Sequence, residues 1–222
     1  MIKIDNTLTF GFEAAIRGMR NPMNSWDKSD SIFDGDYYPD CAFIGENDKK
    51  LMIKLAKSGS DHRKYMRMIN VTADILAPLY WWKEYDTYKV GTVANSCSTM
   101  HKILDKEFTF DDFSIEHLFE TTKMHLSNTI KILNIWRNEC LHYKQKSEDS
   151  KPQKDCWWQI IQLLPSSYNQ LRTVQLNYEV LYHIYFARKG HKLDEWREFC
   201  EWIKTLPLMN EIINESENND VY

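Results

Sequence analysis

The chain has 222 residues, of which 43% are hydrophobic, 27% charged and 14% aromatic, and its formal net charge is −4. This composition excludes a disordered or low-complexity protein and predicts a globular one with a sizeable core. The acidic balance argues against a general nucleic-acid binder, and no apolar stretch approaches the ~18 residues that a membrane span requires. The first residues also lack the apolar core of a signal peptide.

The cysteines are odd in number, and no two are close enough in sequence to suggest a clip. The five are Cys41, Cys97, Cys140, Cys156 and Cys200. Scattered cysteines of this kind favour free thiols in a reducing compartment. The sequence therefore predicts a cytoplasmic protein.

The N-terminal third predicts two strands and two helices. Alternating residues over 2–11 favour a strand, and Glu13–Arg20 favours a short helix. Residues 21–48 are rich in Gly, Pro, Asn, Asp and Ser without a clear period, which indicates a long irregular segment. Lys49–Lys57 is typical of an amphipathic helix. The alternation over Ile69–Ile75 is the clearest strand signal in the chain.

The middle of the chain predicts helices separated by a polar loop. Pro78 is expected in the first turn of an aromatic helix that continues through Tyr85. The small and polar residues over 90–99 predict a loop that lines a site. Apolar residues at near-helical spacing predict one long helix over Ser114–Tyr143, followed by a charged linker over Lys144–Lys154.

The C-terminal third is expected to be helical, with a polar, frayed tail over 215–222. Its helices are predicted over Asp155–Leu164, from a cap at Ser166 or Ser167 to Arg188, and over Leu193–Thr205. One short antiparallel sheet packed with several long helices places the chain in the α+β class. We expect residues 1–222 to form a single domain.

Generic chemical motifs are missing from the sequence. It holds no glycine-rich phosphate loop, no His-Glu-x-x-His and no Gly-x-Ser-x-Gly. Its seven histidines do not pair with the cysteines at the spacing of metal ligands, so we expect no metal site. His183, among Leu181, Ile184 and Phe186, is interpreted as a packed core histidine in preference to a catalytic one. The aromatic pair Trp157-Trp158 and the run Tyr80-Trp81-Trp82 favour core packing over stacking on a flat ligand.

From Leu51 to His101 the chain holds a helix ending in glycine, a strand, a proline, an aromatic helix and a polar loop. This order resembles the flavin-dependent thymidylate synthase family, whose loop carries Arg-His-Arg-x-x-Ser-x-Asn-Glu-x-Ser-x-Arg-Tyr. On that pattern Thr87-Tyr88-Lys89 falls on the first triplet and Thr92 on the first serine. After one inserted residue, Asn95 and Ser98 fall on the asparagine and the second serine, and Met100-His101 falls on the closing pair.

A second stretch near the C-terminus carries the same resemblance. The family has a leucine-proline, then Asn-x-Arg-x-Leu-x-His-Phe-x-x-x-Arg, then His-Ala-Gln-x-Glu-Ile-Arg. Here Leu164-Pro165 is followed at the family spacing by Asn177, Leu181, His183 and Arg188, and then by His191, Glu195 and Arg197.

The resemblance implies an enzyme that converts dUMP to dTMP with FAD, reduced nicotinamide (NADPH) and methylene-tetrahydrofolate, usually as a homotetramer. In such an enzyme the protein mainly binds and orients the cofactors. The residues that the resemblance places in the site are Ser98 and Arg197 as catalytic groups, and Lys89, Thr92, Asn95, Asn177, Arg188 and His191 as cofactor-binding groups. The competing interpretation is that Arg188 and Arg197 form surface ion pairs and that Asn95 and Ser98 shape a turn.

Several family positions are altered. Thr87, Met100 and Glu179 stand where the family has arginines, and Tyr65-Met66 stands where it has a Glu-His pair. Each lost charge-assisted contact costs roughly 1.5–3 kcal/mol of ligand affinity. Two hypotheses follow. The first is a divergent enzyme that binds FAD and a dUMP-like pyrimidine nucleotide, with NADPH and the folate needed only if the family reaction is retained. The alternative is a catalytically inactive scaffold that acts as an oligomeric binding or assembly module.

Overall fold

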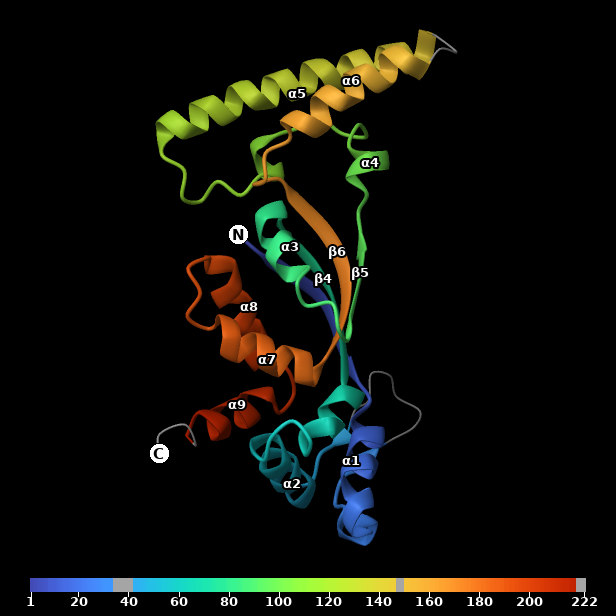
Figure 1. The fold of residues 1–222 in the computed structure, drawn as a ribbon, viewed down its shortest axis with the longest axis vertical. Coiled ribbons are helices and arrows are strands. Elements are labelled where there is room, and N and C mark those ends of the chain that lie inside the picture. The colour runs from blue at the N-terminus through green and yellow to red at the C-terminus, as the bar shows by residue number, and fades with distance from the viewer. Residues whose placement is uncertain (34–41, 147–149, 219–222) are drawn as a thin grey trace. The chain divides into compact units, whose positions relative to one another are not determined.

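The computed structural model describes residues 1–33, 42–146 and 150–218. The chain forms two compact units, each assembled from segments that are separated in sequence (Figure 1). Unit 1 comprises Met1, Leu76–Glu84 and Ser96–Arg172, and unit 2 comprises Ile2–Ile75, Tyr85–Asn95 and Thr173–Tyr222.

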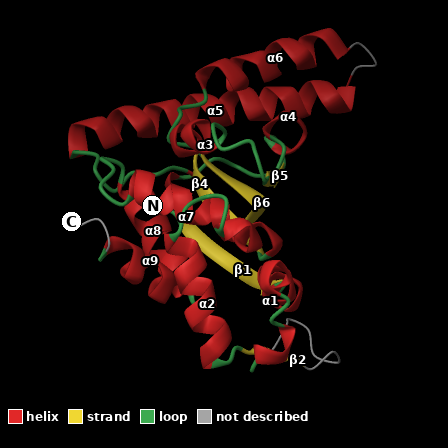
Figure 2. Ribbon diagram, turned by 60° about the horizontal axis from the view of Figure 1, so that its bottom comes forward, coloured by secondary structure: helices red, strands yellow, loops and turns green. Residues whose placement is uncertain are grey.

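A small antiparallel sheet of four strands has the order β1-β4-β6-β5 (Figure 2). Its strands are β1 (Lys3–Phe10), β4 (Asn70–Pro78), β5 (Thr92–Ser96) and β6 (Asn169–Asn177). In β4 the predicted alternation is real, because Val71, Ala73 and Ile75 are buried and the residues between them are partly exposed. The two predicted strands and the α+β class are thus confirmed.

The segment 21–48, which we expected to be irregular, contains short regular elements. It holds two single turns of 3-10 helix, η1 (Asn21–Met23) and η2 (Trp26–Lys28). A two-residue strand β2 (Ile32–Phe33) pairs antiparallel with β3 (Ala42–Phe43). Residues 34–41 of this prediction lie outside the described part of the chain.

Unit 2 is built mainly from helices. They are α1 (Phe12–Arg20), α2 (Glu46–Lys57), the 3-10 helix η3 (Arg63–Met68), α7 (Tyr178–Arg188), α8 (Asp194–Thr205) and α9 (Met209–Glu217). α7 packs against η3 and α8, and α9 packs against α2 and α8. The helix predicted over Glu13–Arg20 is confirmed, and the one predicted over Lys49–Lys57 is confirmed with an earlier start at Glu46.

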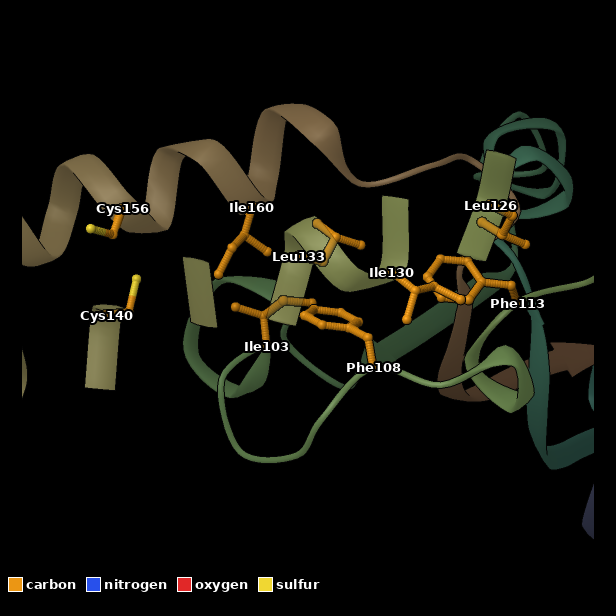
Figure 3. Packing of buried hydrophobic residues seen from close by; sticks show 9 residues of the cluster. All are labelled: Ile103, Phe108, Phe113, Leu126, Ile130, Leu133, Cys140, Cys156 and Ile160. Carbon is orange, nitrogen blue, oxygen red and sulfur yellow. The ribbon is translucent and has the colours of Figure 1, made fainter. Parts of the chain in front are cut away.

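Unit 1 is dominated by a helical hairpin. Its elements are the first residues of α3 (Leu79–Tyr85), α4 (Thr99–Lys102), the 3-10 helix η4 (Phe110–Asp112), α5 (Glu120–Lys146) and α6 (Ser150–Leu163). α5 and α6 lie side by side and share an apolar core with the segment that precedes them (Figures 1 and 3). The core consists of Ile103, Phe108, Phe113, Leu126, Ile130, Leu133, Cys140, Cys156 and Ile160.

The long helix predicted over Ser114–Tyr143 begins later and ends later than expected. Residues 114–119 are not helical, because the Ser114 amide donates to the Ser167 carbonyl and Phe113 forms an isolated β-bridge with Tyr168. The charged segment Lys144–Lys154 is also not a plain linker. α5 continues to Lys146 and α6 begins at Ser150, while residues 147–149 lie outside the described residues.

Two predictions around the aromatic helix need correction. The loop expected over 90–99 contains β5, and the Cys97 amide just beyond it donates to the Leu171 carbonyl. Pro78 is the last residue of β4 rather than part of the first turn of α3. The first two amides of α3, those of Leu79 and Tyr80, donate to the carbonyls of Tyr168 and Ser166.

The prediction for the C-terminal helices is wrong in part. The helix expected from Ser166 or Ser167 to Arg188 is the strand β6 followed by α7. The tail expected over 215–222 is helical as far as Glu217, since Ile212, Ile213 and Ser216 of α9 are buried. Residues 219–222 lie outside the described residues. Within the described ranges, no helix is long and apolar enough to cross a membrane.

Candidate functional site

The predicted site residues fall in both units. Ser98 belongs to unit 1, and the other seven belong to unit 2. Ser98 precedes α4, and its hydroxyl oxygen accepts from the His101 amide at 3.2 Å, which is an N-cap contact. It also lines a cavity of about 200 Å³ with Cys97, Lys102, Lys106 and Tyr168 among others. The lysines there are already paired, Lys102 with Asp105 at 3.0 Å and Lys106 with Asp112.

Lys89, Thr92 and Asn95 lie on the segment that leads into and forms β5. Lys89 and Asn95 are exposed. The Thr92 hydroxyl donates to the Tyr88 carbonyl, which closes the turn before the strand. The structure therefore gives Thr92 a backbone role, and Lys89 is exposed and is not among the residues that line the groove described below.

Asn177 joins the end of β6 to the start of α7. Its side-chain oxygen accepts from the Val180 amide at 3.0 Å and so caps the helix. Gly91 approaches this side chain closely: a β-carbon on Gly91 would lie 2.8 Å from Asn177 Nδ2. With a backbone φ of +76°, Gly91 also needs the left-handed conformation that glycine adopts without strain.

Arg188 stacks on aromatic rings within unit 2. Its guanidinium lies 4.8 Å from the Trp196 ring and 5.6 Å from the Tyr88 ring, and its Nε donates to the Tyr88 hydroxyl at 2.8 Å. Trp196 is fully buried. Arg188 thus ties the end of α7 to α8 and to the 85–95 segment by cation–π contacts.

His191 and Arg197 organise the turn between α7 and α8. His191 Nδ1 accepts from the Leu193 amide at 3.2 Å, and Arg197 donates to the His191 carbonyl at 2.9 Å. Arg197 also forms an ion pair with Asp194, as the competing interpretation of this residue expected. These contacts hold both side chains in the local fold.

A groove of about 570 Å³ lies in unit 2 where α7 meets η3 and the 85–95 segment. We call it the unit 2 groove, and it is lined by Arg67, Thr87, Tyr88, Val90, Gly91, Asn177, Glu179, Val180 and His183. Its volume is in the range of small-molecule sites. His183 was interpreted as a core histidine, and this is wrong: its side chain is 54% exposed and lines the groove, while Leu181 and Ile184 face the core.

Glu179 is the most heavily paired group of the groove. Its carboxylate forms an ion pair with Arg67, lies 3.6 Å from Arg63 Nε and 3.8 Å from His183 Nε2, and is only 8% exposed. Burial by itself raises the pKa of the Glu179 carboxyl. The hydrogen bond and positive charge of Arg67 outweigh burial, so that the pKa lies below its ordinary value. Glu179 is therefore ionised at neutral pH.

Arg63 and Arg67 were not among the residues predicted for the site. Their only signal in the sequence is a spacing of four, and the 3-10 helix η3 brings both arginines to Glu179. Tyr65 and Met66, between them, are buried, and the Tyr65 hydroxyl donates to the Met52 carbonyl at 2.8 Å. The Tyr65-Met66 pair is thus part of the core.

The arginines of unit 2 do not fit FAD in the way that the resemblance implies. A flavin dinucleotide carries a diphosphate, which needs fixed positive charge. Arg188 is stacked between rings, Arg197 is paired with Asp194, and Glu179 neutralises Arg67. Among the described residues, no group of three or more His, Cys, Asp or Glu side chains could hold a metal ion.

Comparisons with known proteins show the fold. No protein-family model matches the chain, and no curated protein matches it. Two solved structures that are similar to it are thymidylate synthase X of Helicobacter pylori with FAD and dUMP, at 14% and 15% identity with TM-scores of 0.65 and 0.63. In both cases the match spans 96% of this chain, and it spans 97% and 99% of the two H. pylori chains. A third is the UMP/dUMP methylase PolB of Streptomyces cacaoi with 5-Br dUMP, at 12% identity, a TM-score of 0.60 and coverage of 96% of this chain and 94% of that one. The chain therefore has the fold of the flavin-dependent thymidylate synthases.

Proposed function

We propose that the protein is a divergent relative of the flavin-dependent thymidylate synthases that binds a pyrimidine nucleotide of the dUMP type in the unit 2 groove. The observation that carries the proposal is the groove itself, a concave site of about 570 Å³ within this fold. The similar structures from H. pylori and S. cacaoi are named as complexes with dUMP or a brominated dUMP. This supports the pyrimidine class of ligand.

The chemistry of the groove suits a heterocycle with hydrogen-bonding edges. Asn177 presents an amide, Thr87 a hydroxyl and Tyr88 a phenol, and Val90 and Val180 add apolar surface. A uracil ring has alternating donors and acceptors at its edge, and the Asn177 Nδ2 group can donate to one of the acceptors while Oδ1 caps α7. Because sites of this kind are mostly apolar with a few polar groups that fix orientation, the lining residues are of the right type.

Isothermal titration calorimetry with dUMP tests the proposal. We expect saturable binding in the micromolar range, equivalent to about 8 kcal/mol at 1 μM. A nucleotide of the purine class, dGMP, is the matched control and should bind at least about tenfold more weakly, since guanine presents a different pattern of donors and acceptors to the polar groups of the groove. No heat of binding with dUMP, or equal binding of dGMP, would contradict the proposal.

Binding of FAD is tested separately. If the protein follows the family in using FAD, it purifies yellow, and added FAD raises its melting temperature. The pairing of Arg188, Arg197 and Glu179 with neighbours in unit 2 leads us to expect colourless protein. Thymidylate formation with NADPH and methylene-tetrahydrofolate is accordingly not expected.

The second candidate is a non-catalytic scaffold that forms a homo-oligomer in the cytoplasm as a binding or assembly module. The observation that favours it is that Ser98, Asn177 and Arg197 serve helix caps and turns. Light scattering coupled to gel filtration, together with the calorimetry above, separates the two. A stable tetramer without nucleotide affinity supports the scaffold, and a nucleotide-binding protein of any oligomeric state excludes it.

A further inference from the structure

Glu179 places a negative charge in the wall of the unit 2 groove. It is the second residue of α7, and its carboxylate is held by Arg67 and lies close to Arg63. Arg63 is 14% exposed, stacks 4.7 Å from the Tyr182 ring and donates to the Ala56 carbonyl at 3.3 Å. These contacts fix Arg63 behind the carboxylate, whereas Arg67 is 56% exposed and lines the groove.

The two oppositely charged side chains of the groove wall are thus paired with each other, and Arg63 is a second cation behind the carboxylate. Arg67 is positive and Glu179 is negative, and both line the groove. A phosphate that approached Arg67 would have to share it with a carboxylate that is already bonded to it. The phosphate would also meet the repulsion of that carboxylate at short range, where charges near a protein surface interact strongly.

We propose that Glu179 is a specificity-determining residue that occupies the guanidinium of Arg67 and so removes the preference of the groove for a phosphorylated ligand over the uncharged nucleoside. This inference rests on the proposed function, because it concerns the same groove. Affinity comes from the heterocycle and its polar partners, and the phosphate adds little. Specificity is a difference between two affinities. The negative charge of Glu179 lowers the affinity for the phosphorylated ligand and not that for the nucleoside.

The experiment measures the dissociation constants of deoxyuridine and dUMP and takes their ratio. In the unchanged protein we expect the two constants to agree within about threefold. In Glu179→Gln, which keeps the shape of the side chain and removes its charge, Arg67 becomes available to the phosphate. A charge-assisted contact of this kind should tighten dUMP binding by at least about tenfold relative to deoxyuridine binding, so that the ratio of the two constants changes by that factor.

Two further variants serve as controls. Glu13→Gln removes the same charge from an exposed position on α1 outside the groove, so it should leave both constants unchanged. The double variant Glu179→Gln with Arg67→Gln should return the ratio to about one, because the gained contact needs Arg67.

The outcomes separate the inference from the proposed function. If neither ligand binds the unchanged protein, the proposed function fails. If both bind but dUMP is already favoured by more than about tenfold, or Glu179→Gln does not change the ratio, the inference is overturned while the proposed function stands.

A measurement on the unchanged protein covers the case in which Glu179→Gln does not fold. Because Arg67 is already bonded to Glu179, no direct contact between Arg67 and the phosphate remains for salt to screen, and dUMP affinity should change by less than about threefold between roughly 50 and 500 mM NaCl. A fall of about tenfold or more over this range would show that the phosphate is bound by uncompensated positive charge, and would overturn the inference.

Discussion

The hairpin core of unit 1 and the buried ion pair of unit 2 use opposite physical means to hold their elements together. Between α5 and α6 the buried side chains are apolar apart from the thiols of Cys140 and Cys156 (Figure 3). Burial, together with the neighbouring Cys156, raises the pKa of the Cys140 thiol to about 12. In unit 2, by contrast, Arg20 and Asp48 are buried as ions, with Nε and Oδ1 2.6 Å apart.

The difference lies in what each arrangement requires. An apolar core gains free energy roughly in proportion to the area removed from water and tolerates some rearrangement. A buried ion pair needs every partner in place. Asp48 accepts from the side chains of Ser29 and Ser31 as well as from Arg20, so that one carboxylate fastens the segment before β2 to α1 and α2. We expect unit 2 to respond to pH and the hairpin core to be insensitive to it.

The largest expected effect is that of Asp48→Asn. Removing one partner of a buried pair leaves the charge of Arg20 uncompensated, which should lower the free energy of unfolding by about 3–5 kcal/mol. Urea unfolding at neutral pH measures it. Asp5→Asn, a change of the same kind at an exposed position on β1, should alter the free energy by less than about 0.5 kcal/mol.

The pH dependence of this effect follows from the Asp48 pKa. Burial alone raises it, but the hydrogen bonds from Ser31, Ser29 and Arg20 bring it below its ordinary value. Stability from a depressed pKa is present above the unfolded value and is lost as the pH falls through the folded value. The difference in the free energy of unfolding between the unchanged protein and Asp48→Asn should thus be constant above about pH 5 and become smaller below about pH 4. A gap that stays constant in acid would contradict this account.

Leu133→Ala is the corresponding change in the hairpin core. Leu133 is fully buried, and its truncation should cost about 2–5 kcal/mol through lost burial and the cavity left behind. The loss should be equal at neutral pH and at about pH 5, because no charge is involved. Ile135→Ala, at an exposed position of the same helix, is the control and should cost less than about 0.5 kcal/mol. A strongly pH-dependent loss for Leu133→Ala would remove the contrast between the two regions.

The sequence predicted those elements whose hydrophobic pattern coincides with their burial. The alternation over Ile69–Ile75 identified β4 because its apolar residues are the buried ones. The strand β6 was missed because its pattern is inverted at one end: Gln170 is buried and Leu171 is 45% exposed. Gln170 Nε2 donates to the Cys97 carbonyl at 2.9 Å, so that a long-range contact decides which side faces inward. Short-range periodicity cannot contain that information.

The candidate site was predictable in outline but not in its charges. The resemblance directed attention to the 87–98 and 177–197 segments, and Asn177 does line the groove. The sequence shows Glu179 only as a position at which the family has an arginine. Its pairing with Arg67 depends on the packing of η3 against α7, which no local pattern encodes. The partners of Arg188 and Arg197 were likewise fixed by tertiary contacts, and whether any predicted residue binds a ligand stays a prediction.

Asn177 gives the smallest expected effect on stability and the sharpest separation of fold from binding. Asn177→Ala removes the cap of α7 and should cost about 1 kcal/mol. Asn177→Ser keeps a capping oxygen and should be nearly as stable as the unchanged protein, but it lacks the amide that faces the groove. If that amide contacts the pyrimidine, both variants weaken dUMP binding by about fivefold or more, although only one is destabilised. If dUMP affinity instead follows the melting temperature and Asn177→Ser binds normally, the cap is the whole role of Asn177, and the groove recognises its ligand through Thr87 and Tyr88.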